Sequence, residues 1–120
     1  MGLDMMIRDT EGNDVAYWRK VPSVHEWFRQ LGIKKGIDKC EDPEHFNGIE
    51  VPIVKEDISD LINDLCAKNM DYEVKGFFFG SDKEMDDLHF AYYMRDNFDQ
   101  IENMLIALKK GKDLYYTSWW

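Results

Sequence analysis

Long apolar runs, paired cysteines and surplus positive charge are all missing from this 120-residue sequence. No apolar run approaches the roughly 18 residues of a membrane-spanning helix, and residues 1–9 contain no apolar core of a signal peptide. The two cysteines, Cys40 and Cys66, lie far apart and form no Cys-x-x-Cys pair. We therefore expect a cytoplasmic protein with both thiols reduced, and with Cys66 buried on the inner face of a helix.

Negative charge dominates the composition. Fifteen Lys and Arg stand against 24 Asp and Glu, which gives a formal net charge of −9. Nucleic-acid backbones and anionic membranes attract surplus positive charge, so this balance excludes a general affinity for either. It does not exclude a small anionic ligand at a local basic spot, because Arg19, Lys20 and Arg29 lie apart from the acidic segment 82–102.

The chain has the size and composition of one folded domain, residues 1–120, with 44% hydrophobic and 32% charged residues. Period-two alternation predicts strands, and apolar residues three and four apart predict helices. The expected elements are strands at 3–9 and 15–18 around a turn, a helix from Ser23 to Gly32, a surface loop at 33–47, an edge strand at 49–54, a helix at 56–66, a strand at 77–79, a long helix at 83–110 and a strand at 114–119. We predict an α+β fold with a small, mostly antiparallel sheet of about four strands against three helices, the last one long.

Local signals refine the expected helix ends. Ser23 and Glu26 match a capping box, and Gly32 stands where a left-handed residue would end that helix. Ser81 or Asp82 is the expected N-cap of the long helix. The expected inner stripe of that helix is Met94, Phe98, Ile101, Leu105 and Leu108.

Basic and aromatic residues gather in the segment from Tyr17 to Lys20. Strand geometry puts Tyr17 and Arg19 on the face opposite Trp18. We expect His25 to be half-exposed one turn before Arg29. Together with Arg19 and Lys20 these side chains would form an anion pocket or an acid/base site. Alternatively, these side chains only pair with the surplus Asp and Glu or form local hydrogen bonds.

Two other segments could contribute to binding. Gly80 and Ser81, at the start of the long helix, would offer free N–H groups to a phosphate or carboxylate, or would serve only as caps. Phe78 is the central ring of three consecutive phenylalanines. Tyr116 and Trp119 could form a binding surface or pack in the core.

Metal and catalytic signals are weak. Cys40 and His45, with His25 or His89, lack the regular spacing of a zinc site, and no Ser-His-Asp or Cys-His motif is present. We therefore expect no metal and no cofactor. The long helix is acidic, and its carboxylates are either a solvated surface or a face that binds a basic protein or imitates DNA phosphates. The residues of that candidate face are Glu84, Asp86, Asp87, Asp96 and Asp99.

Five short segments occur together along the chain: Met1 to Met5, Tyr17 to Lys20, His25 to Phe28, Gly76 to Ser81, and Tyr115 to Trp119. In this order they resemble a family of small proteins common in tailed phages and prophages, for which no activity is established. The resemblance implies that these recurrent segments converge on one ligand-binding face. The candidate residues are Asp4, Tyr17, Arg19, Lys20, His25, Phe78, Gly80, Ser81, Tyr116, Ser118 and Trp119.

The resemblance and the missing catalytic set together suggest a non-enzymatic phage accessory protein of the host cytoplasm. It would bind a host protein or a small ligand and counteract a host defence. One alternative is a nucleotide-sequestering protein that uses Arg19, Lys20 and the N–H groups of Gly80 and Ser81. Another is a small enzyme on a nucleotide or phosphate, with His25 as acid/base. A structural role in the virion is a third alternative. The protein could also be a homo-oligomer.

Overall fold

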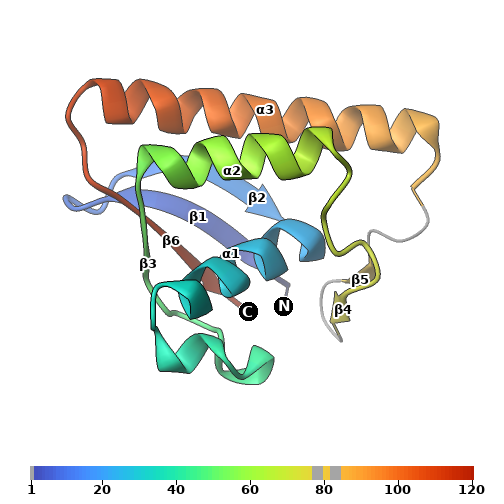
Figure 1. Cartoon of the computed structure of the whole chain (residues 1–120), viewed down its shortest axis with the longest axis horizontal. Helices are drawn as coiled ribbons and strands as arrows, with labels where there is room; N and C mark the ends of the chain where they lie inside the picture. The colour runs from blue at the N-terminus through green and yellow to red at the C-terminus, as the bar shows by residue number, and fades with distance from the viewer. Residues whose placement is uncertain (1, 77–79, 82–84) are drawn as a thin grey trace.

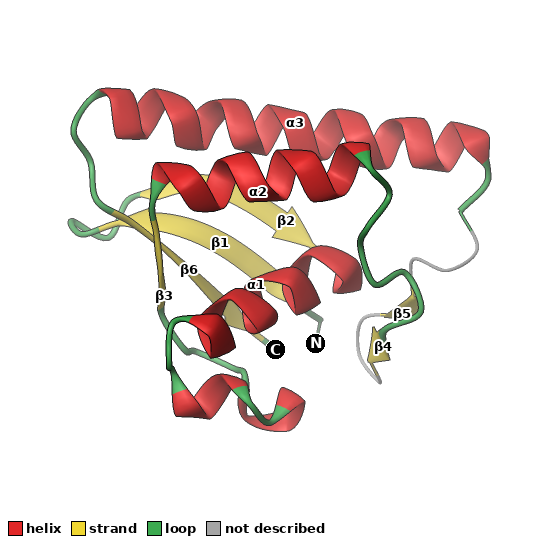
Figure 2. Cartoon of the chain, viewed as in Figure 1, coloured by secondary structure: helices red, strands yellow, loops and turns green. Residues whose placement is uncertain are grey.

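The computed structural model describes residues 2–76, 80–81 and 85–120 and has an α+β fold. Figure 2 shows the helices and strands. They are β1 (Asp4–Asp9), β2 (Asp14–Arg19), α1 (Pro22–Lys34), two 3-10 turns at Asp38–Cys40 and Pro43–His45, β3 (Val51–Ile53), α2 (Lys55–Cys66), β4 (Lys75–Gly76), β5 (Gly80–Ser81), α3 (Asp87–Lys109) and β6 (Leu114–Trp119).

The main sheet has four antiparallel strands in the order β2-β1-β6-β3, and β4 pairs with β5 in a separate small ribbon. Because β1 pairs with both β2 and β6, the two ends of the chain lie side by side (Figure 1). The register places Asp4 next to both Arg19 and Trp119. The predicted fold class is confirmed, including the edge position of the strand that contains Pro52.

Helices cover one face of the sheet (Figure 1). Neighbouring residues of a strand alternate between the two faces, and the side chains that point toward the helices are buried and mostly apolar. Met5, Ile7 and Trp18 illustrate this side, each at most 1% exposed. Their strand neighbours Tyr17 and Trp119 are exposed. The described residues therefore form a two-layer core and leave one sheet face uncovered.

Both outer strands have a partner along their free edge. At β2, the backbone N–H of Tyr17 donates to Oε1 of Gln100 on α3 at 3.0 Å. At β3, Nζ of Lys35 donates to the carbonyl of Pro52. Side chains thus occupy backbone groups that could otherwise pair with another strand.

The first helix departs from its predicted boundaries. It begins at Pro22 after Val21, without a side-chain cap, so the predicted capping box is wrong. Proline is suited to this first position because it has no N–H to satisfy. The Ser23 hydroxyl instead pairs with the Tyr93 hydroxyl of α3 at 2.9 Å, and Glu26 pairs with Arg29.

Gly32 does not end this helix, which continues to Lys34. A Cβ at Gly32 would lie 2.3 Å from Sγ of Cys40 and 3.2 Å from Cγ2 of Val51. Glycine is therefore used for close packing rather than for termination. The segment 33–47 is not only a surface loop, because Cys40 and Phe46 are fully buried beneath α1.

Several predictions for the second half of the chain were also wrong. Cys66 is exposed, whereas Cys40 is the buried cysteine. The long helix begins at Asp87 with Asp86 as its N-cap, so neither Ser81 nor Asp82 caps it. Phe98 and Leu105 are more than a third exposed. Ile101 of the predicted stripe is buried, and Met94 and Leu108 pack partly buried against the core. The buried residues of α3 are Asn97, Ile101, Met104 and Ala107.

The Gly32 contact yields a stability prediction. Gly32→Ala should lower the free energy of unfolding by about 1–3 kcal/mol, although alanine favours helices, because the added methyl overlaps Cys40. In a Cys40→Ala background the same substitution should cost less, since Sγ is gone. Urea unfolding of the four proteins in this cycle measures the effect. An equal penalty in both backgrounds would contradict the proposed contact.

Candidate functional site

The uncovered face of the sheet, which we call the open face, is a grid of side chains set by strand register. Cross-strand partners project to the same side, so each row of the grid can be read from the pairing. The rows are Arg19-Asp4-Trp119, Tyr17-Met6-Thr117 and Asp14-Arg8-Tyr115. Large aromatic groups are accessible at two of these positions: Trp119 is 67% exposed and Tyr17 is 45% exposed.

Asp4 organises one end of the open face. Its Oδ1 accepts a hydrogen bond from the Tyr17 hydroxyl at 2.5 Å and lies 3.9 Å from Nε of Arg19. The hydrogen bond to the carboxylate raises the pKa of Tyr17, so this phenol stays protonated near neutral pH. The arrangement presents a neutral ring and a solvent-exposed guanidinium together.

Beside Asp4, the open face contains a depression of about 480 Å³. The carboxylates of Asp4 and Glu50 and the guanidinium of Arg8 give it charges of both signs. Gly48 closes one side: its N–H donates to the carbonyl of Ser118 at 2.8 Å, and a Cβ added at Gly48 would lie 3.8 Å from Cζ3 of the Trp119 ring. The lining residues are Asp4, Met6, Arg8, Gly48, Glu50, Tyr115, Thr117, Ser118 and Trp119.

The structure brings together part of the predicted site. Asp4, Tyr17, Arg19 and Trp119 share the open face, and Ser118 lines the depression although its side chain is buried. Lys20 is exposed just beyond β2 and has a left-handed backbone with φ 55°. These residues come from both ends of the chain.

His25 and Tyr116 belong to the core and not to the open face. His25 is 6% exposed, so the prediction of a half-exposed side chain is wrong. Its Nδ1 lies 2.6 Å from the Tyr116 hydroxyl, and its ring lies 4.8 Å from that of Phe46. Burial lowers the pKa of His25 to about 4 and raises that of Tyr116. At neutral pH the pair is therefore uncharged and shielded from solvent.

The predicted anion pocket does not form, because Arg29 is otherwise engaged. Its guanidinium makes two hydrogen bonds to Glu26, at 2.8 and 2.7 Å, and also donates to the carbonyls of Cys40 and Glu41. These bonds attach the 38–46 segment to α1. Arg29 is thus a structural cation, separated from Arg19 on the open face.

The predicted backbone site at Gly80 and Ser81 is also absent. These residues form β5, paired with Lys75 and Gly76, and α3 begins only at Asp87. Their N–H groups therefore do not lie at a helix N-terminus. Phe78 lies outside the described residues.

The predicted acidic face does not gather on one side of α3. Asp87 and Asp96 are nine residues apart, about two and a half helical turns, so they project in opposite directions. Asp86 accepts a hydrogen bond from the N–H of His89 as the N-cap. Asp99 is exposed, and Glu84 lies outside the described residues. Most of these carboxylates are therefore distributed around the helix.

Metal binding has no support from side-chain placement in the described ranges. No group of three His, Cys, Asp or Glu side chains among residues 2–76, 80–81 and 85–120 could hold a metal ion. Cys40 is buried, and its burial raises the pKa of the thiol, whereas His45 is exposed and pairs with Asp42. No helix in the described part of the chain is both long and apolar enough to cross a membrane.

Sequence reasoning missed several lining residues of the depression. Met6, Arg8, Tyr115 and Thr117 could have been found, since they have the same strand parity as Asp4 and Trp119. Gly48 and Glu50 had no comparable signal. They reach the site through the loop before β3, and no periodic pattern predicts where that loop lies.

The buried histidine makes acid stability a test of this core. The unfolded chain binds a proton at His25 near pH 6.5, but the folded protein does so only near pH 4. Lowering the pH through this window should therefore reduce the free energy of unfolding, by roughly 3 kcal/mol in total from this group. Chemical denaturation at several pH values measures it. His25→Gln should have a flatter slope between pH 6.5 and 4, and an unchanged slope would contradict the assignment.

Comparisons with protein-family models, curated proteins and solved structures found no match to this chain.

Proposed function

We propose that this chain is a non-enzymatic, phage-encoded accessory protein that binds a host protein through the open face. The observation that supports this most is the presence of two large exposed aromatic side chains, Trp119 and Tyr17, on a sheet face that no helix of the described residues covers. In this proposal the protein acts in the host cytoplasm, and binding its target counteracts a host defence.

The chemistry of the open face suits protein recognition. Tryptophan, tyrosine and arginine provide most binding energy in protein interfaces, because they combine large apolar area with a polar end. Trp119, Tyr17 and Arg19 supply all three types around Asp4. Strand pairing holds their backbones before a partner arrives, so little conformational entropy is lost on binding.

A small ligand is the second candidate occupant of the same face. The depression of about 480 Å³ beside Trp119 falls within the general size range of ligand sites, and Arg8 and Glu50 give it both charge signs. An amphipathic or zwitterionic molecule would match this lining better than a highly anionic one.

Two alternative functions have less support. A nucleotide-sequestering protein of the predicted kind would bind through Arg19, Lys20 and a helix N-terminus at Gly80 and Ser81, but Gly80–Ser81 is a strand and α3 begins at Asp87. An enzyme that uses His25 as acid/base would need that ring to reach a substrate, and it is buried against Phe46 and Tyr116. We therefore place the activity on the open face and outside the core.

Binding can be tested with tagged protein produced in host cells. Partners captured by the wild-type chain would be identified, purified and titrated calorimetrically against the wild type and Trp119→Ala. Removing the exposed indole should weaken binding by roughly 30-fold or more, the effect of a central interface residue. Folding should be unaffected, because Trp119 is 67% exposed.

Val54→Ala is the control, since Val54 is 49% exposed at the start of α2 and is not among the lining residues of the depression. It should bind like the wild type. Small-molecule thermal-shift screening tests the second occupant, with Trp119→Ala again as the loss-of-binding variant. Equal affinity of Trp119→Ala and wild type for the captured partner would overturn the proposed function.

A further inference from the structure

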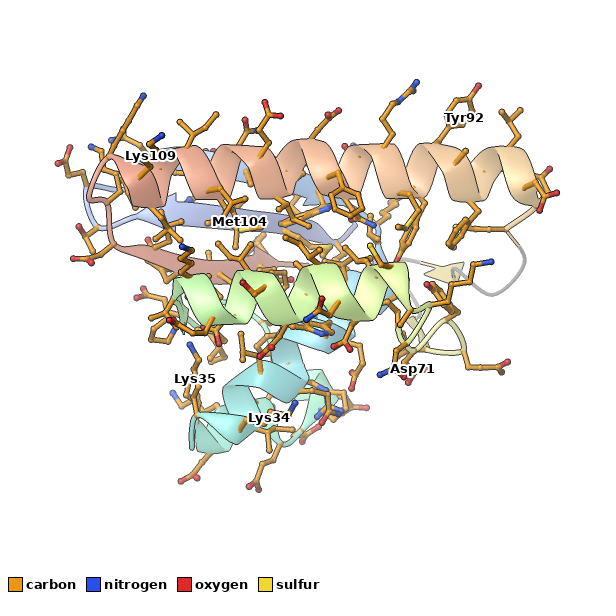
Figure 3. All side chains as sticks on the ribbon, turned by 45° about the horizontal axis from the view of Figure 1, so that its top comes forward. Lys34, Lys35, Asp71, Tyr92, Met104 and Lys109 are labelled. Carbon is orange, nitrogen blue, oxygen red and sulfur yellow. The ribbon has the colours of Figure 1, made fainter. Side chains whose placement is uncertain are left out.

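The long helix α3 has an outer face on which several apolar side chains are exposed. Its inner face, with Ile101 and Met104, packs on the sheet and α2. In Figure 3, Met104 points into the molecule and Tyr92 points away from it. Five of the eight exposed large hydrophobic residues in the described part of the chain belong to α3. They are Leu88, Tyr92, Phe98, Leu105 and Ile106.

The outer side chains have the spacing of a helix-pairing seam. Intervals of three and four residues alternate along them, which is the a/d pattern of a coiled coil. The seam positions are Leu88, Ala91, Arg95, Phe98, Glu102, Leu105 and Lys109, flanked by Tyr92 and Ile106. A seam of this length covers about 32 Å of helix.

A shallow apolar groove adjoins the seam. It has a volume of about 390 Å³ and lies between α2 and α3, where Ile62, Phe98 and Leu105 form much of its wall. A side chain that projects from a second helix along the seam could enter this groove. The outer face therefore has a row of exposed seam side chains beside an apolar groove.

We propose that the outer face of α3 pairs with the same face of a second copy of this chain, with the two helices antiparallel. Charge determines both the partner and the direction. The two seam charges near the middle, Arg95 and Glu102, lie equally far from a midpoint between Phe98 and Asp99. An antiparallel two-fold places Arg95 opposite Glu102 of the other copy, twice over. A parallel pair would instead bring like charges together.

Several flanking positions agree with this register, whereas Leu88 lies opposite Lys109 and the two Asp99 carboxylates lie close to the axis. Tyr92 lies opposite Leu105 of the second copy, Ala91 lies opposite Ile106, and the acidic start of α3 at Asp87 meets Lys110. In the described part of the chain neither Arg95 nor Glu102 forms an ion pair. The Arg95 guanidinium instead lies 5.1 Å from the Tyr92 ring centre. Both charges are therefore available for a partner, and the antiparallel helix dipoles are favourably opposed.

This inference is independent of the proposed function. Trp119 and Tyr17 belong to β6 and β2, whereas the dimer would use α3 and the adjoining side of α2. Either surface can fail its test while the other succeeds.

Sedimentation velocity of the full chain tests the dimer. The wild type should reach twice the 14.3 kDa monomer mass with increasing concentration. Arg95→Glu alone and Glu102→Arg alone should each sediment as monomers, because each creates two like-charge contacts in a homodimer. An equimolar mixture of these two variants should form a heterodimer, since both cross-pairs are then opposite in charge.

The mixture also guards against simple misfolding, because a misfolded variant would not regain assembly. Trp119→Ala serves as the surface control and should remain dimeric. The proposal is overturned if the wild type stays at 14.3 kDa at every concentration, or if the single charge reversals dimerise as well as the wild type.

Cysteine cross-linking tests the antiparallel direction. In a Cys66→Ser background, which removes the exposed native thiol, Asp99→Cys should form a disulfide-linked dimer because it lies next to the two-fold axis. Leu88→Cys should not, since the two copies of that residue lie at opposite ends of the seam. Cross-linking at both positions would show a parallel pair and overturn the register.

Discussion

The packing of Tyr116 determines which face of the sheet is covered and which stays open. Tyr116 lies in β6, between β1 and β3, and is fully buried. Its ring stacks on Phe28 with centroids 4.1 Å apart and an interplanar angle of 9°, and its hydroxyl pairs with His25. Both partners belong to α1, so this one side chain fixes the first helix on the sheet.

The open face follows from that constraint. Side chains alternate along a strand, so burying Tyr116 sends Tyr115 and Thr117 to the opposite side. A slip of one residue in β6 would exchange the two sets, and the resulting loss of the Phe28 contact opposes it. The position of Trp119, three residues further on, is therefore determined by the same packing as the core.

The regular elements and the sides of their strands could be predicted, because both depend on local periodicity. Trp18 inside and Tyr17 outside follow from alternation alone. Which residues form the site could not be predicted, because this depends on contacts between residues distant in sequence. The His25 ring packs against Phe46, which comes from a loop distant in sequence. The Ser23 hydroxyl pairs with the Tyr93 hydroxyl of α3 and does not cap its own helix. Gly32 was predicted to end the first helix because glycine is common there. Its actual role, close packing against Cys40, has no sequence signal. The net charge of −9 likewise gave no indication of the mixed charges on the open face.

The central claim is that the open face makes the contact with the partner. Hydroxyl-radical footprinting of the wild-type protein, free and bound to its captured partner, measures this directly at individual side chains. We expect strong protection of Trp119 and Tyr17 in the complex, with unchanged reactivity at Val54, which is exposed but does not line the depression. A complex in which Trp119 reacts as fast as in the free protein would contradict the account.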